Sequence, residues 1–299
     1  MTGATIRGGH VLPRDTRRRI PPYHADMPAA PSLTIVMPAY NEAERLGPAL
    51  DELFGYLLRP APSRTGGRSA DELGPWDVLV VDDGSADATA AIVDARPEAQ
   101  AGPDGSPPRL RVLRRPHAGK GAAVKAGVLA ATGDLVIFTD ADMATPPDQI
   151  PLLAERLLDH EVALGSRVQT DGTDRRASQP AHRRALGKVF RAMSGAWVTG
   201  NVPDTQCGFK GFQRDAGQDL FARQKITSIV FDAEIIHLAR RRAYRIAIVP
   251  VQWADKRGSR MHVRPALALR VLWDLARIPL IHRGVPRAPA MIDAGSPRR

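Results

Sequence analysis

The sequence predicts an α/β protein with a mainly parallel central sheet flanked by helices. Between residues 33 and 165, short apolar runs alternate with longer helical patterns, and strands separated by helices are typical of βαβ units. The chain has 299 residues, 43% of them apolar, which is enough to fill the core of one large domain or two small ones. We expect one α/β domain over residues 33–262.

The expected strands are the short apolar runs, taken in chain order. They are LTIVM (33–37), DVLVV (77–81), LRVL (110–113), DLVIF (134–138) and EVALGS (161–166). Helical patterns lie between them at residues 42–58, 86–95, 119–131 and 148–159. Two polar insertions rich in Gly and Pro, at residues 59–75 and 96–109, are expected to be surface loops.

Both ends of the chain are expected to be disordered tails. Residues 1–32 contain Arg17 to Arg19 and several prolines, but no apolar core of the length found in signal peptides. Residues 285–299 are expected to form the second tail. No stretch reaches the roughly 18 uninterrupted apolar residues that a membrane span requires.

Residues 263–284 are expected to form an amphipathic helix. Arg270, Asp274 and Arg277 are spaced by four and three residues and so form one polar stripe. Much of the remaining surface is apolar, namely Leu267, Leu269, Val271, Leu272, Trp273, Leu275, Ile278, Leu280 and Ile281. Such a helix lies in a membrane interface, or packs on its own domain or on a partner subunit.

The charge of the chain indicates an anionic partner. The formal net charge is +10, which favours nucleic acid, an acidic membrane surface or phosphorylated substrates. Aromatic residues are only 5% of the chain and are not interleaved with the basic clusters as in single-strand-binding surfaces, so nucleic acid ranks lowest. The one cysteine, Cys207, cannot form an intrachain disulfide and is expected to be buried.

Two carboxylates follow the fourth predicted strand. In TDADMATPP, Asp140 and Asp142 are two positions apart, and in an extended segment such residues face the same side, roughly 6.6 Å apart. A divalent cation would remove their repulsion, because Mg²⁺ or Mn²⁺ is held by one or two carboxylates together with substrate phosphates. The alternative is a solvated turn, since Asp and Pro are ordinary turn residues.

Acidic residues also follow the first two predicted strands. PAYNE (38–42) comes after the first strand and DDGS (82–85) after the second. Ligands of open α/β sheets bind beyond the carboxyl ends of the strands. This convergence favours a metal and nucleotide site over the solvated turn.

Lys120 lies between Gly119 and Gly121 where a helical pattern begins. Helix N-terminal amides and a cation both favour an anion there. A P-loop does not fit, because that motif needs Ser or Thr at the position of Gly121.

These motifs, in this order, resemble family two inverting glycosyltransferases with the nucleotide-diphospho-sugar-binding GT-A fold. They are MPAYNE, VVDDGSADAT, GKGAAVKAG and DAD. Later segments, DTQCGFKGF, FDAEIIHLA and VQWADKRGSRM, resemble the polyprenyl-phosphate sugar synthases, most closely the dolichyl-phosphate β-glucosyltransferases. The resemblance covers roughly residues 33–261.

The resemblance implies roles for individual residues. Asp140 and Asp142 would hold Mg²⁺ or Mn²⁺, and Asp204 would be the catalytic base or would orient the acceptor. The nucleotide sugar would contact Pro38, Ala39, Tyr40, Glu42, Asp82, Asp83, Lys120, Asp140, Ala141 and Gln206. The acceptor phosphate needs positive charge near the donor, and Arg167, Lys256, Arg257, Ser259 and Arg260 offer the groups to bind it.

The expected reaction moves a hexose, glucose from UDP-glucose in the first instance, onto a polyprenyl or dolichyl phosphate. Two alternatives keep the same fold and donor chemistry: another sugar, either mannose from a GDP-sugar or an N-acetylhexosamine, or a soluble acceptor. A nucleic-acid-binding α/β protein is the alternative from a different functional class. The enzyme is expected to be cytoplasmic and peripheral to the cytoplasmic face of a membrane. Many relatives of this kind have C-terminal transmembrane helices, so a separate membrane-spanning partner is a further expectation.

Overall fold

The computed structural model describes residues 31–59, 74–169, 171–174, 194–200, 202–254 and 265–286, with side chains from residue 269 in the last range. These residues form a seven-stranded sheet in the order β3-β2-β1-β4-β6-β5-β7. The strands are β1 (Leu33–Ala39), β2 (Trp76–Asp82), β3 (Leu110–Arg114), β4 (Leu135–Thr139), β5 (Val162–Ser166), β6 (Phe209–Gln213) and β7 (Ile246–Pro250).

The sheet is mainly parallel, as predicted. Strand β6 runs antiparallel to β4 and β5, whereas the other neighbouring strands are parallel. The five predicted strands are present, with ends that differ by one or two residues. Strands β6 and β7 were not predicted. The sequence FKGFQ of β6 has a lysine at its second position and a glycine at its third, so it lacks the apolar pattern of a buried strand.

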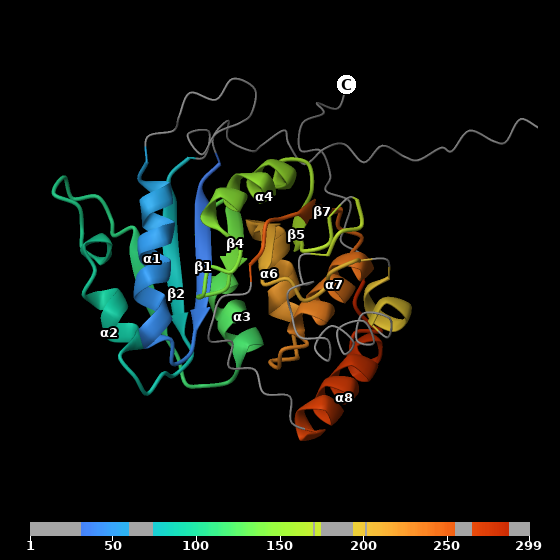
Figure 1. Cartoon of the computed structure of the whole chain (residues 1–299). Coiled ribbons are helices and arrows are strands. Elements are labelled where there is room, and N and C mark those ends of the chain that lie inside the picture. Colours follow the sequence, from blue (N-terminus) through green and yellow to red (C-terminus); the bar gives the residue numbers. More distant parts are fainter. Residues whose placement is uncertain are drawn as a thin grey trace, which may run out of the picture.

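Helices cover both faces of the sheet (Figure 1). On one face, α1 (Ala43–Leu57), α2 (Thr89–Asp94) and α4 (Ile150–Leu157) pack on side chains such as Val78 and Val80 of β2. The opposite face carries α3 (Lys120–Ala130), α6 (Arg214–Arg223) and α7 (Phe231–Arg241), which pack on the alternate residues Leu79 and Val81. This alternation along β2 is the period of two expected for a strand between two cores.

Shorter turns and a last helix complete the described structure. They are η3 (Pro97–Ala99), η4 (Pro147–Gln149), the π-helical turn η6 (Gly195–Thr199) and α8 (Pro265–Ile281). Leu275 and Ile278 of α8 are buried against Val198 of η6 and Ala233 of α7. Within the described ranges, no helix combines the length and apolar character needed to cross a bilayer.

The polar stripe of α8 is not a uniformly solvated face. Asp274 is only 2% exposed; it accepts a hydrogen bond of 2.7 Å from Ser228 Oγ and pairs with Arg277 at 2.7 Å. Large apolar side chains lie on the outside instead, with Leu269 69%, Leu272 42%, Trp273 67% and Leu280 61% exposed. The helix therefore turns part of its polar stripe toward the domain and an apolar stripe outward.

Candidate functional site

The predicted acids of DAD lie at the carboxyl end of β4, but in a turn and not in the strand. Strand β4 ends at Thr139, and Met143 N donates a hydrogen bond of 3.1 Å to Asp140 O, while Met143 has a positive φ of 48°. The prediction that Asp140 and Asp142 lie in an extended segment was therefore wrong. Ala141 and Met143 are buried in the core, so the turn is anchored and the carboxylates of Asp140 and Asp142 remain at the sheet edge.

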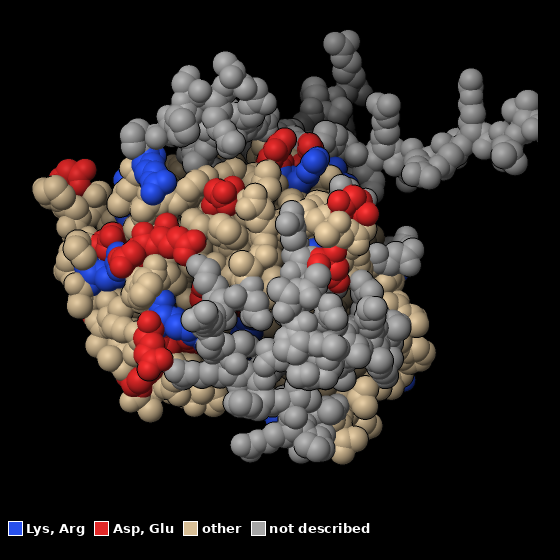
Figure 2. All heavy atoms as spheres, viewed as in Figure 1, with Lys and Arg blue, Asp and Glu red and all other residues tan. Residues whose placement is uncertain are grey.

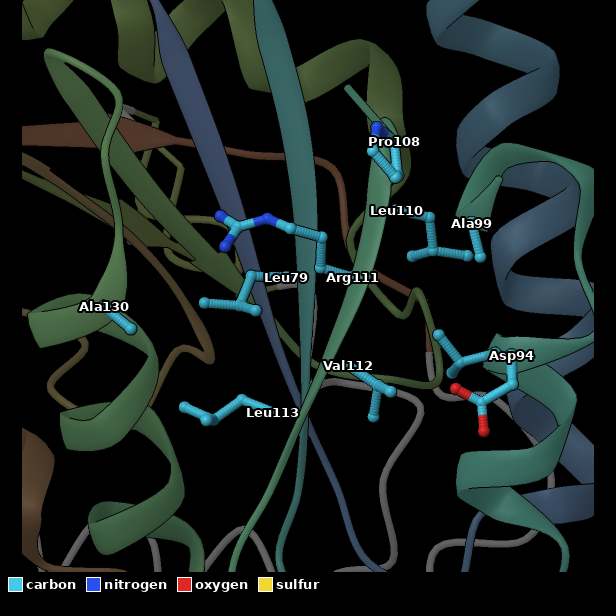
Figure 3. Close-up of a pocket in the computed structure, with 10 residues that line it drawn as sticks. Leu79, Asp94, Ala99, Pro108, Leu110, Arg111, Val112, Leu113 and Ala130 are labelled. Atoms are coloured by element: carbon cyan, nitrogen blue, oxygen red, sulfur yellow. The ribbon is translucent and has the colours of Figure 1, made fainter. Parts of the chain in front are cut away.

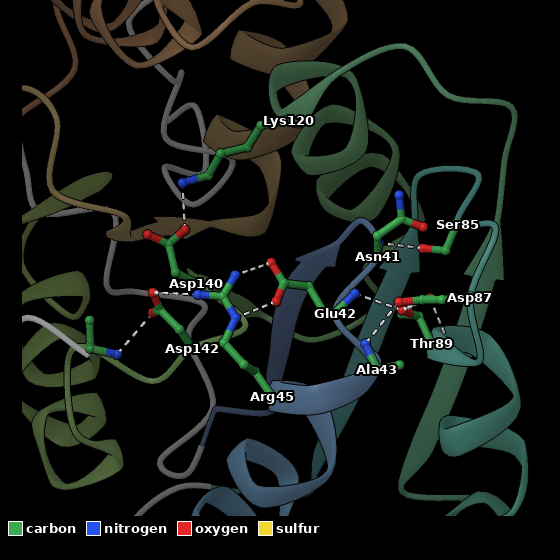
Figure 4. A network of polar contacts seen from close by, with 11 residues as sticks. Asn41, Glu42, Ala43, Arg45, Ser85, Asp87, Thr89, Lys120, Asp140 and Asp142 are labelled. Carbon is green, nitrogen blue, oxygen red and sulfur yellow. Dashed lines mark hydrogen bonds and ion pairs between the residues drawn. The ribbon is translucent and has the colours of Figure 1, made fainter. Parts of the chain in front are cut away.

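Each of the two carboxylates has a cation nearby (Figure 4). Lys120 Nζ lies 2.5 Å from Asp140 Oδ1, and Arg45 Nη1 lies 4.0 Å from Asp142 Oδ2. Burial and the charge of Asp140 still raise the pKa of Asp142. A further cation beside the two carboxylates would favour their charged forms.

The donor set fits a hard divalent cation that also binds substrate oxygens. Among the described residues, no group of three or more His, Cys, Asp or Glu side chains is arranged to hold a metal. The site thus offers the paired carboxylates of Asp140 and Asp142, which suits Mg²⁺ or Mn²⁺ completed by phosphate and water.

Lys120 begins α3, and the loop before it is fastened to β2 through Asp83. The Asp83 carboxylate is buried; it accepts hydrogen bonds of 2.7 Å from Arg115 Nη1 and 2.8 Å from Gly119 N, and lies 2.9 Å from His117 Nδ1. Asp83 therefore positions the loop from residue 115 to 119. Asp82 has a different contact, since its Oδ1 accepts a hydrogen bond of 3.1 Å from Ser85 N.

An aromatic platform lies beside this loop. The rings of Tyr40 and His117 are stacked, with centroids 4.1 Å apart, and Tyr40 is 45% exposed. Pro38 and Ala39 pair with Val81 and Asp82 of β2. The end of β1 and the end of β2 therefore meet next to the platform.

Glu42 is bound by Arg45, which was not among the predicted site residues. Arg45 forms two hydrogen bonds to the Glu42 carboxylate, of 2.6 Å and 2.5 Å. Arg115 and His117 were also missed. The available signals were the i, i+3 spacing of Glu42 and Arg45 on a helix, and the basic run RRPH just before Gly119.

Asp204 and Arg167, which were assigned to separate roles, form one buried ion pair. Asp204 accepts hydrogen bonds from Arg167 N at 3.0 Å, Nε at 2.7 Å and Nη2 at 2.7 Å. Burial opposes the charge on Arg167, but Asp204 outweighs it and raises the pKa of the guanidinium. The guanidinium also lies 5.5 Å from the ring centroid of Trp253.

The remaining predicted residues lie around this pair or outside the described structure. Gln206 Nε2 contacts Ile229 O at 3.4 Å. Lys256, Arg257, Ser259 and Arg260 lie outside the described residues. Before that gap, Ala254 N donates a hydrogen bond of 3.0 Å to Ala144 O, two residues from Asp142.

Cys207 is buried and free, as predicted. Burial, followed by the charge of Asp204, raises the pKa of its thiol to about 12. The thiol is therefore protonated at neutral pH and is not a nucleophile.

A depression at one edge of the sheet is separate from this site. It has a volume of about 390 Å³ and lies along the edge strand β3, between Asp94 of α2 and Ala130 of α3 (Figure 3). None of the predicted site residues lines it.

The face shown in Figure 2 has basic and acidic side chains interspersed among its described residues. Nucleic-acid-binding proteins instead gather Lys and Arg into a patch or stripe. The described part of this face therefore gives no support to a nucleic-acid interface.

Comparison with known proteins identifies the family. Residues 34–221 match the model of glycosyl transferase family 2. The chain is 34% identical over 257 residues to the dolichyl-phosphate beta-glucosyltransferase ALG5C of Trichomonas vaginalis, covering 84% of this chain and 71% of that protein. It is 32% identical over 240 residues to the dolichyl-phosphate beta-glucosyltransferase of Drosophila melanogaster, covering 77% and 69%.

The fold also resembles a solved structure. Glucosyl-3-phosphoglycerate synthase from Mycobacterium tuberculosis, in complex with Mn²⁺, UDP-glucose and phosphoglyceric acid, superposes with a TM-score of 0.55 at 18% identity, covering 86% of this chain and 81% of that one. At this identity the likeness concerns the fold. The sheet topology, the acids at its carboxyl edge and the match over residues 34–221 together place this chain in glycosyltransferase family 2, with the GT-A α/β fold.

Proposed function

We propose that this protein transfers glucose from UDP-glucose to the phosphate of a dolichol or another polyprenol, with inversion at the anomeric carbon. The observation that supports this most is the turn with Asp140 and Asp142, where Lys120 lies 2.5 Å from Asp140. The Tyr40–His117 platform lies at the carboxyl ends of the neighbouring strands. The named activity of the relatives supports the sugar and the acceptor.

The diphosphate of the donor lies against the turn. Asp140 and Asp142 would hold Mg²⁺ or Mn²⁺, which when bound supplies positive charge to the departing diphosphate. Lys120 adds charge from the protein, because its ammonium is already directed at this point. The structures of the mycobacterial synthase contain Mn²⁺ or Mg²⁺ with UDP, which is consistent with either metal.

The nucleoside lies over the ends of β1 and β2. The exposed ring of Tyr40, backed by His117, offers a stacking surface to the base. Asp82 accepts the base N–H or ribose hydroxyls, since an ionised carboxylate is an acceptor only. The other proposed contacts are Pro38, Ala39, Glu42, Asp83, Ala141 and Gln206.

The acceptor phosphate approaches Arg167. A phosphomonoester has a second pKa near 6 and is largely a dianion at neutral pH, so its oxygen attacks without a strong base. Asp204 then serves to orient the Arg167 guanidinium beside the acceptor, through the hydrogen bonds that it accepts from Nε and Nη2. Lys256, Arg257, Ser259 and Arg260, which follow Ala254 in the chain, are proposed to complete the phosphate site.

The enzyme is proposed to work at a membrane surface, on its cytoplasmic side, because the acceptor is a lipid. The outward stripe of Leu269, Leu272, Trp273 and Leu280 on α8 supplies an apolar face. Exposed Arg270 adds attraction to anionic lipid. A membrane-spanning partner that moves the product stays a prediction.

A radiochemical transfer assay tests the proposal. The purified chain is given labelled UDP-glucose, GDP-mannose or UDP-N-acetylglucosamine, with dolichyl phosphate in detergent or with soluble 3-phosphoglycerate. We expect organic-extractable label from UDP-glucose with Mg²⁺ or Mn²⁺ and none with excess chelator. Label only in a water-soluble product would replace the lipid acceptor by a soluble one, and no transfer from any donor would reject the proposal.

A further inference from the structure

Lys210 is a lysine with no exposed surface on an inner strand of the sheet. It lies on β6 with 0% exposure, and its Nζ donates hydrogen bonds to Asp232 Oδ1 at 2.6 Å and Cys207 O at 2.5 Å. A buried ammonium is costly unless it is paired. The pair with Asp232 therefore needs an explanation beyond packing, since an apolar pair would fill the space at less cost.

Asp232 is close enough to the site to act on Lys120. Asp232 lies in the first turn of α7, 4% exposed, and α7 begins directly against the start of α3. Gly121 N donates a hydrogen bond of 3.0 Å to Thr227 O. The two segments are so close that a Cβ on Gly121 would come within 2.7 Å of Phe231 Cβ. This packing brings the Asp232 charge near Lys120: burial lowers the pKa of the Lys120 ammonium, but the charges of Asp140 and Asp232 outweigh it and raise that pKa.

The second contact of Lys210 leads to Asp140. Lys210 holds the carbonyl of Cys207, and the next residue, Gly208, has its backbone directly against the Asp140 side chain. A Cβ on Gly208 would lie 2.0 Å from Asp140 Oδ2, so a side chain there would displace the Asp140 carboxylate. Lys210 thus supports the backbone that backs the carboxylate contacting Lys120.

We infer that Lys210 is a positioning residue for the donor diphosphate: it neutralises Asp232, so that Lys120 stays on Asp140 and remains available to the diphosphate. The charges alternate along this row, Asp140, Lys120, Asp232 and Lys210. Without the Lys210 charge, Asp232 competes with Asp140 for Lys120. The inference rests on the proposed nucleotide-sugar donor.

The test compares nucleotide binding of Lys210→Met, Asp232→Asn and the double variant by calorimetry with UDP and Mn²⁺. Lys210→Met leaves Asp232 without its lysine partner. We expect binding about 10- to 100-fold weaker, the range found when the partner of a metal-binding side chain is changed, with a matching rise in KM for UDP-glucose. Asp232→Asn removes the negative charge that would compete with Asp140 for Lys120. We therefore expect UDP affinity within a few-fold of wild type, although the fold loses stability. The double variant is expected to regain the affinity of Asp232→Asn.

Lys125→Met is the matched control, since Lys125 lies on the same helix as Lys120 and donates to the carbonyl of Gln224, not to a carboxylate. If Lys210→Met does not fold, Lys210→Gln gives the same comparison, because it keeps a donor for Cys207 O but lacks the charge. A purely structural pair predicts that UDP affinity follows thermal stability in every variant. Equal losses in Lys210→Met and Asp232→Asn, or a double variant as weak as Lys210→Met, would overturn the inference. A wild type that binds UDP but transfers no sugar would reject the proposed function alone.

Discussion

Arg167 and Asp204 illustrate how a buried charge pair assigns roles to single residues. The Asp204 carboxylate accepts two hydrogen bonds from the Arg167 guanidinium and one from the backbone N–H of Arg167. A base must be free to take a proton, whereas this carboxylate already satisfies a fork of donors. The pair is therefore better suited to orienting Arg167 than to proton transfer.

Asp204→Asn is expected to raise KM for the lipid phosphate by about 10- to 100-fold, because a charge-assisted hydrogen bond contributes about 1.5–3 kcal/mol. The KM for UDP-glucose changes little. Steady-state kinetics with each substrate varied in turn provides the measurement. Asp219→Asn, which breaks a comparable pair with Arg242 in another part of the domain, is the control. A fall in kcat of about 10²-fold or more with unchanged acceptor KM would assign Asp204 as a base instead.

Sequence patterns predicted where the acids of the candidate site lie better than which residues contact them. Asp140 and Asp142 follow an apolar run directly, so their place at a strand end could be derived from local sequence. The cations that contact the acids come from other segments: Arg115 and Asp83 are 32 residues apart. The basic run RRPH indicates cations near Gly119, but a single sequence does not indicate that Arg115 and His117 contact Asp83.

At the scale of elements, α8 shows what helical periodicity can and cannot establish. Spacing predicts a helix with a polar stripe, but not which side faces the domain. Ser228 and Arg277 satisfy Asp274, which allows the acid to be buried. The exposed residues 269, 272, 273 and 280 then lie on one side at helical spacing, and Trp197, 58% exposed, is joined to this helix by a hydrogen bond of 3.0 Å from its Nε1 to Ala276 O.

Removing apolar side chains from this stripe is expected to weaken membrane binding. Tryptophan favours the lipid–water interface, and we expect the double variant Trp273→Ser, Leu280→Ser to bind anionic vesicles roughly tenfold or more weakly, from the apolar area withdrawn from lipid. Flotation with phosphatidylserine-containing vesicles measures this.

Leu58→Ser is the control for this experiment, since Leu58 is 55% exposed at the end of α1. Transfer to a short, water-soluble prenyl phosphate should be unchanged in the α8 variant, because the donor site is intact. Equal vesicle binding by the wild type and the α8 variant would show that another surface makes the contact.

At the scale of the whole molecule, the sheet could be predicted as far as the local alternation extends. The strands up to residue 166 follow one another as βαβ units, whereas β6 inserts antiparallel between β4 and β5. The insertion places Lys210 and the 204–208 segment behind Asp140. The position of these residues in the candidate site therefore depends on a long-range strand pairing that the apolar pattern does not reveal.

The complete site should stabilise the whole fold when it is filled. A ligand that binds only the folded state at about 100 times its Kd adds about 2.7 kcal/mol, which for a domain of this size corresponds to a rise in Tm of about 5–10 °C. We expect UDP with Mn²⁺ to give this rise in a thermal-shift measurement.

The variant Asp140→Asn, Asp142→Asn should lose the rise, whereas Asp94→Asn, which changes an exposed acid on α2, should keep it. Because the metal would bind both the two carboxylates and the diphosphate oxygens, metal and diphosphate should stabilise the protein more together than singly. An equal rise with UDP in excess chelator would mean that Lys120 and Arg45 hold the diphosphate without a metal, and the two acids would then have to be reassigned to holding those cations.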